Sequence, residues 1–141
     1  VGGQILDLEA EGPPPDAAGL EAIHRAKTAA LISAACALGG LTAGAASHTV
    51  RALGSYGAQL GLAFQIVDDL LDVTGDPSDT GKAVGVDEAR AKATYPAVHG
   101  VDRTQQQARL AGNSALDELA QLPGDTSVLV GMVDFVLDRL H

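Results

Sequence analysis

The chain has 141 residues, of which 46% are hydrophobic and 3% are aromatic, and its formal net charge is −9. This apolar fraction argues against a disordered chain, and the length suits one domain with its own core. The acidic balance argues against nucleic acid as a partner, because phosphate contacts need clustered lysines and arginines. It does not exclude small phosphorylated ligands, because divalent cations can bridge carboxylates and phosphates.

The single cysteine, the lack of a long apolar stretch and the amino terminus bear on the cellular location of the protein. Cys36 cannot form an internal disulfide and lies in an Ala/Leu-rich run, which favours a buried structural thiol. No stretch has the 18 or so uninterrupted apolar residues of a membrane span. Val1-Gly2-Gly3 has neither the basic stretch nor the apolar run of a signal peptide, and the chain does not begin with Met. We therefore expect a cytoplasmic protein and a chain that is part of something longer.

Helical periodicity runs through most of the chain and is interrupted by proline and glycine. Residues 1–11 are expected to end a helix, which Gly12-Pro13-Pro14-Pro15 breaks, and Asp16 is a plausible N-cap for the next one. The predicted elements that follow are helices at about 17–46, 49–74, 103–121 and 126–140, a short helix opened by Tyr95-Pro96, and a loop over 75–93. No alternating strand pattern occurs, so we predict an all-α fold.

Each of the two longest predicted helices has apolar residues at helical spacing. In the first they are Leu20, Ile23, Leu31, Ala34, Leu38 and Leu41. In the second they are Val50, Leu53, Leu60, Phe64, Val67 and Leu71. Gly39-Gly40 lies inside the first helix, which indicates a kink or a close crossing with another helix.

The second of these helices also carries an acidic stripe. Gln65, Asp68, Asp69 and Asp72 are spaced i, i+3, i+4 and i+7, so their side chains share one face of a helix. The alternative is an ordinary solvated face, but such a face would mix lysine with glutamate, and no cation occurs within the same two turns. Like charges at this spacing cost roughly 0.2–0.5 kcal/mol per pair. A bound cation would offset that cost.

Magnesium fits this stripe best. It accepts one or two protein carboxylates and completes its shell with water and phosphate oxygens. Calcium is the weaker alternative, because no twelve-residue loop of alternating oxygen ligands is present. Zinc is disfavoured, because no histidine or cysteine lies at ligand spacing.

Several lysines are further candidates for a phosphate site. Lys27 falls on the apolar face of its helix, where it either extends to solvent or meets a diphosphate, with Thr28 as a second donor. His24, one turn earlier, is interpreted as structural or surface-exposed. Lys82 beside Gly81, and Lys92, lie in the predicted loop, where a solvated lysine is the alternative. A further polar pair, Gln4 and Asp7, remains open between a polar patch and a cap.

Together these segments resemble the trans-isoprenyl diphosphate synthases, especially the farnesyl and geranylgeranyl type. The resemblance covers about residues 2–121 and lies in Gly3-Gln4-Ile5-Leu6-Asp7, the Lys27-Thr28 helix, Phe64-Gln65 followed by Asp68-Asp69-x-x-Asp72, Gly81-Lys82 and Lys92-Ala93-Thr94-Tyr95-Pro96. The aspartate segment resembles the second aspartate-rich motif of that family.

The resemblance implies a fold, a reaction and a set of residue roles. The fold would be part of an antiparallel helical bundle of the isoprenoid synthase type, usually dimeric. The reaction would join isopentenyl diphosphate to an allylic diphosphate with Mg2+. Asp68 and Asp72 would be magnesium ligands and Asp69 would assist through water. The remaining roles would be diphosphate contacts from Lys27, Lys82 and Lys92, and positions near the reacting carbons for Thr28 and Gln65.

One feature of the family is absent from this sequence. Its first aspartate-rich motif and the basic site for isopentenyl diphosphate precede the segments that match here. We therefore expect residues 1–141 to be the carboxyl-terminal half of a polyprenyl synthetase domain, inactive alone unless the missing half is a separate polypeptide. The expected macromolecular partner is a second copy of the chain in a homodimer or a complementing amino-terminal half. The alternatives are a non-catalytic helical subunit that serves association, and a class I terpene cyclase. A cyclase usually has Ser or Thr in place of some of these aspartates.

Overall fold

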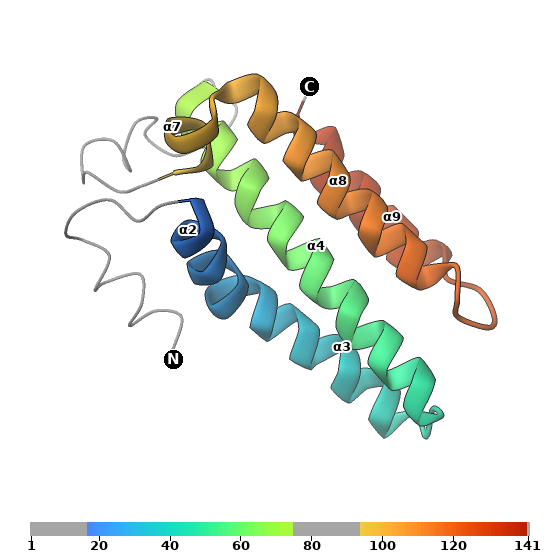
Figure 1. The fold of residues 1–141 in the computed structure, drawn as a ribbon. Coiled ribbons are helices and arrows are strands. Elements are labelled where there is room, and N and C mark those ends of the chain that lie inside the picture. Colours follow the sequence, from blue (N-terminus) through green and yellow to red (C-terminus); the bar gives the residue numbers. More distant parts are fainter. Residues whose placement is uncertain (1–16, 75–93, 141) are drawn as a thin grey trace.

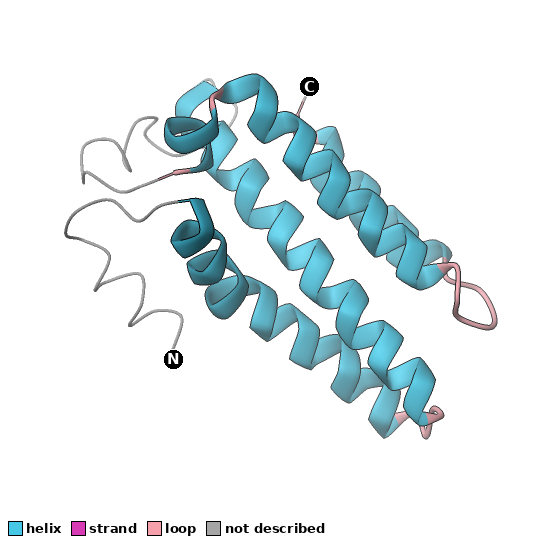
Figure 2. Cartoon of the chain, in the orientation of Figure 1, coloured by secondary structure: helices cyan, strands magenta, loops and turns pink. Residues whose placement is uncertain are grey.

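The structure, a computed structural model, describes residues 17–74 and 94–140, and over these residues the chain is helical (Figures 1 and 2). The elements are α2 (Ala17–His24), the π-helical turn η1 (Arg25–Ala29), α3 (Ala30–Thr42), α4 (Ser47–Thr74), α7 (Tyr95–His99), α8 (Val101–Leu119) and α9 (Ser127–Asp138). No strand occurs within the described ranges, which confirms the predicted all-α fold. None of the helices described is long and apolar enough to cross a membrane.

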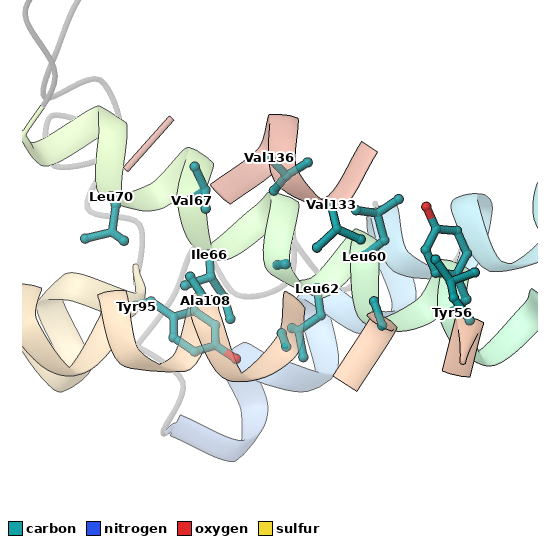
Figure 3. Packing of buried hydrophobic residues seen from close by; sticks show 14 of the residues in the cluster. Tyr56, Leu60, Leu62, Ile66, Val67, Leu70, Tyr95, Ala108, Val133 and Val136 are labelled. Carbon is teal, nitrogen blue, oxygen red and sulfur yellow. The ribbon is translucent and has the colours of Figure 1, made fainter. Parts of the chain in front are cut away.

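The central helix is α4, which packs against α3 on one side and α8 on the other, with α9 in contact with both α4 and α8 (Figure 1). Apolar residues of α4 run the length of the core and meet Tyr95, Ala108 of α8, and Val133 and Val136 of α9 (Figure 3). The most buried residues of α4 are Tyr56, Leu60, Ala63, Ile66, Val67 and Leu70. Because α4 is covered from several directions, a polar group on its buried part must find a partner in the protein.

Small residues let α3 and α4 approach closely. The hairpin between them turns at Gly44, which has a positive φ of 74°. A Cβ added at Gly61 would lie 2.5 Å from the Cα of Ala29, and one at Gly40 would lie 2.7 Å from the Leu53 side chain. The close crossing predicted at Gly39-Gly40 is therefore present at Gly40, and a second one occurs where η1 meets α4.

The π-helical turn η1 changes which face of the first long helix is buried. A π turn contains one residue more than an α turn, so it rotates the following helix by about 100°. Leu20 and Ile23 are buried as predicted, but Leu31, Leu38 and Leu41 are 71%, 58% and 62% exposed. The apolar face that the spacing predicts for residues 17–46 therefore does not continue as one buried face, because η1 turns these leucines away from α4. Ala29 and Gly40 face α4 instead.

Most predicted helix ends agree with the observed ones within two residues. The first helix is an exception, since it ends at Thr42 rather than at 46. Its end is set by Gly44, and the Ala45 amide donates to the Gly40 carbonyl at 3.0 Å in the hydrogen-bond pattern of a Schellman cap. The short helix predicted at Tyr95-Pro96 is α7, and the hydroxyl of Thr94 caps it by accepting from the Ala97 amide at 3.4 Å.

Cys36 packs against the core from α3 and is half-buried, and burial raises the pKa of its thiol. This environment agrees with a structural thiol, because a raised pKa leaves little reactive thiolate.

Candidate functional site

The acidic stripe lies on the carboxyl-terminal part of α4, as predicted, but its four members differ in burial. Gln65 and Asp69 are buried, whereas Asp68 and Asp72 are half-buried. The stripe is therefore neither a fully solvated face nor a fully buried one. Asp68 and Asp72 lie at its accessible edge, and Asp69 lies on the protein side.

Asp69 is held by two neighbouring segments. Its Oδ2 accepts a hydrogen bond from the His24 ring at 3.0 Å and another from the Tyr95 amide at 2.9 Å. The His24 ring stacks on the Tyr95 ring with centroids 5.2 Å apart and planes at 24°. Burial raises the pKa of Tyr95 to about 12, with a smaller contribution from the Glu21 carboxylate. The Tyr95 hydroxyl is therefore neutral at physiological pH. Oδ2 of Asp69 is already hydrogen-bonded within the protein by His24 and Tyr95.

Thr28 of η1 and Gln65 of α4 contact each other one helical turn away from the His24–Asp69 contact. The Thr28 hydroxyl donates to the Gln65 side-chain oxygen. Thr28 lies in η1 and Gln65 in α4, so the contact joins two residues that sequence reasoning singled out separately. Lys27 precedes Thr28 in η1 and is half-buried. The structure thus brings the lysine-bearing turn alongside the aspartate-bearing helix.

Arg139 is a cation near the stripe that sequence reasoning missed. Its Nη2 lies 3.8 Å from Asp68 Oδ1, and its Cζ lies 5.5 Å from the centre of the Phe64 ring. No cation occurs within the same two turns of α4, as the sequence shows, but Arg139 directly follows α9. No local pattern connects Arg139 with α4, because the two are far apart in the chain.

The donor set is compatible with magnesium but does not form an all-protein metal site. Among residues 17–74 and 94–140, no group of three or more His, Cys, Asp or Glu side chains gathers closely enough to hold a metal ion. Magnesium needs only one or two protein carboxylates when phosphate and water supply the rest. Asp68 and Asp72, one turn apart and half-buried, fit that requirement from one side.

Several predictions from the sequence concern residues outside the described ranges. They are the candidates Lys82, Lys92, Gln4 and Asp7, the cap Asp16, the helix end over 1–11 and the loop over 75–93.

Comparison with known proteins supports one family. The family model described as polyprenyl synthetase matches residues 1–122. The farnesyl diphosphate synthase of Escherichia coli (strain K12) is 44% identical over 142 residues, covering 98% of this chain and 48% of that protein. The chain therefore spans about half the length of the curated relatives it matches.

Solved structures agree in fold. A polyprenyl synthase from Caulobacter crescentus CB15, complexed with calcium and isoprenyl diphosphate, superimposes with a TM-score of 0.92 at 27% identity, covering 99% of this chain and 55% of that one. A geranyltransferase from Helicobacter pylori, complexed with magnesium and isoprenyl diphosphate, has a TM-score of 0.78 at 31% identity, with coverages of 98% and 45%. Because the family model matches most of its length, this chain belongs to the polyprenyl synthetase family.

Proposed function

We propose that this chain takes part in magnesium-dependent prenyl transfer, in which isopentenyl diphosphate condenses with an allylic diphosphate. The observation that carries the proposal is the alignment of the α4 aspartate stripe with the Lys27-Thr28 turn, joined by the hydrogen bond from Thr28 to Gln65. This alignment occurs in a chain whose relatives include farnesyl and geranylgeranyl diphosphate synthases. It provides carboxylates for a cation and a lysine for a phosphate on the same side of α4.

The proposed roles of the aspartates follow their burial. Asp68 and Asp72, at the accessible edge, would be the magnesium ligands. Asp69 would assist through water, since one of its oxygens is already held by His24 and Tyr95. Magnesium bound here would neutralise the negative charge that develops on a departing diphosphate.

The proposed roles of the remaining residues follow their place beside the stripe. Lys27 would bind the allylic diphosphate through its ammonium group. Thr28 and Gln65 would lie near the reacting carbons, where a hydroxyl and an amide can orient the allylic group. We also assign diphosphate contacts to Lys82 and Lys92, as the family resemblance implies.

The chain would supply one wall of the site. We propose that residues 1–141 form the carboxyl-terminal half of a polyprenyl synthetase domain, which is supported by the half-length match to relatives. The opposing carboxylates would then come from a complementing amino-terminal half. Inactivity of the chain alone, a homodimeric state and a cytoplasmic location stay predictions.

The direct test is a condensation assay with labelled isopentenyl diphosphate, geranyl diphosphate and Mg2+. We expect product only when the chain is combined with an amino-terminal half, and loss of product in Asp72→Asn. The matched control is Asp134→Asn, which alters an exposed aspartate on α9. Turnover by the chain alone would contradict the half-site proposal, and equal turnover in the two variants would contradict the role of Asp72.

A second candidate function is association without catalysis. The observation that favours it is a row of exposed apolar residues on α9: Val128, Met132 and Phe135 are 77%, 48% and 69% exposed. Such residues are typical of surfaces that bind other proteins. Thermal stability with Mg2+ and a bisphosphonate separates the two functions, because a purely structural subunit would not be stabilised by the combination.

A further inference from the structure

Three segments of the chain converge on one oxygen atom. Asp69 Oδ2 on α4 accepts from His24 at the end of α2 and from the backbone amide of Tyr95 at the start of α7. His24 and Asp69 are each 7% exposed, and the Tyr95 ring covers the imidazole. We call His24, Asp69 and Tyr95 the buried node. It ties α2 and α7 to the helix that carries the aspartate stripe.

A histidine at this position is unfavourable for the stability of the folded state, because one polar atom of its ring is buried without a partner among the described residues. Its Nε2 lies against the carboxylate and must donate, which leaves Nδ1 as the other polar atom of the ring. Nδ1 is buried and has no hydrogen-bond partner among the described residues. A buried polar atom without a partner lowers the stability of the folded state, whereas an apolar pair of similar shape can be nearly neutral. Packing alone therefore does not account for a histidine paired with an aspartate at this depth.

The buried node is the first of three successive contacts that determine how η1 lies along α4. The second is the hydrogen bond from Thr28 to Gln65, and the third is the close contact between Ala29 and Gly61. Lys27 and Thr28 follow His24 by one turn, and Asp68 and Asp72 flank Asp69. Whatever fixes His24 against Asp69 therefore also fixes the lysine-bearing turn relative to the aspartates.

We propose that His24 is a positioning residue for the aspartate stripe. Its Nε2–H holds the Asp69 carboxylate, which orients α4 so that Asp68 and Asp72 face the same ligand as Lys27. This inference rests on the proposed function, because it assigns a role at the same metal–diphosphate site. Removing a residue that orients a metal ligand typically lowers metal affinity or activity about 10–100-fold.

Two amide side chains give a sharp test. In His24→Gln the amide nitrogen can reach the place of Nε2 and donate to Asp69, whereas the shorter His24→Asn places its amide near Nδ1 and cannot. Binding of Mn2+ in the presence of inorganic pyrophosphate is measured by calorimetry on the complete protein, beside the condensation assay. We expect His24→Asn to bind Mn2+ about tenfold or more weakly, and His24→Gln to stay within about threefold of wild type.

A core variant controls for general destabilisation. Val133→Ala removes buried volume from α9, and Val133 is not among the residues proposed for the site. We expect it to lower thermal stability without weakening Mn2+ binding.

The outcomes separate this inference from the proposed function. Equal Mn2+ binding in wild type, His24→Gln and His24→Asn overturns the positioning role, and so does equal weakening in both variants. Weakening in Val133→Ala as large as in His24→Asn also overturns it, because the effect is then one of stability. A wild-type protein that neither condenses substrates nor binds Mn2+ with pyrophosphate overturns the proposed function, and this inference with it.

Discussion

Gly61 is the single residue on which the approach of η1 to α4 depends most. A Cβ at this position would lie 2.5 Å from the Ala29 Cα and 3.1 Å from its nitrogen, and these backbone atoms cannot rotate away. We expect Gly61→Ala to lower the free energy of unfolding by about 1–3 kcal/mol, as overpacking does. Chemical denaturation measures the change.

Gly54 provides the matched control, because it lies on the same helix. A Cβ there would meet Ala37 and Ser33 at an ordinary 3.7 Å. Gly54→Ala is expected to preserve stability or to raise it by up to about 1 kcal/mol, because alanine is the better helix former. Equal destabilisation by the two substitutions would show that the close approach at Gly61 is not a constraint.

The buried Tyr56 hydroxyl predicts how the stability of the fold changes in alkaline solution. It is fully buried, its hydroxyl donates to the Leu129 carbonyl at 2.8 Å, and burial raises its pKa to about 12, helped by the charge of Cys36. Between the unfolded pKa of about 10 and this folded value, only the unfolded chain releases the proton. The free energy of unfolding therefore falls as pH rises, by at most about 1.4 kcal/mol per pH unit from this group.

Tyr56→Phe tests that origin. The variant loses the hydrogen bond and is expected to be less stable than wild type by about 0.5–1.5 kcal/mol near neutral pH. The difference should shrink in denaturation experiments at about pH 11, because the variant lacks the titrating hydroxyl. A difference that stays constant from neutral to alkaline pH would contradict the assignment.

The aspartate stripe shows how far the sequence could predict individual residues. The spacing of Gln65, Asp68, Asp69 and Asp72 was enough to place them on one face of α4. It could not separate the buried Asp69 from its half-buried neighbours, because the difference arises from His24 and Tyr95, which come from other segments. Arg139 was missed for the same reason.

At the scale of elements, helical periodicity predicted where α4, α8 and α9 lie, because glycine and proline interrupt it between helices, and Tyr95-Pro96 predicted α7. It failed at η1, because Arg25–Ala29 contains no glycine or proline that would signal an irregular turn. The turn η1 packs against α4, and such a tertiary contact leaves no local pattern in the sequence. The apolar face predicted for α3 is consequently not its buried face.

That exposed apolar face leads to a prediction for α3. Leu38 has an apolar side chain of the kind found in protein cores, but it is 58% exposed, whereas Leu60 on α4 is 3% exposed. We expect Leu38→Gln to change the free energy of unfolding of the chain by less than about 0.5 kcal/mol, and Leu60→Ala to lower it by about 2–5 kcal/mol. Urea denaturation of both variants measures this. A loss in Leu38→Gln comparable to that in Leu60→Ala would show that α3 buries the face predicted from periodicity.

At the scale of the whole molecule, α4 serves two purposes that its sequence combines. Its apolar residues hold α3, α8 and α9 together, and its polar stripe lies beside the lysine-bearing turn η1. The all-α fold was predicted correctly, since composition, periodicity and family resemblance agreed. In the proposed function, this arrangement makes α4 and η1 one wall of a diphosphate site whose opposite wall comes from another part of the family's domain.

The central claim is that Asp68 and Asp72 bind diphosphate through magnesium. Calorimetric titration of inorganic pyrophosphate, with and without Mg2+, tests it most directly. The double variant Asp68→Asn, Asp72→Asn is compared with Asp134→Asn, Asp138→Asn, which removes two exposed aspartates at the same spacing on α9. We predict Mg2+-dependent binding in wild type and in the α9 control, and binding about tenfold or more weaker in the α4 variant. Pyrophosphate binding that ignores Mg2+, or that the α4 substitutions leave unchanged, would contradict the claim.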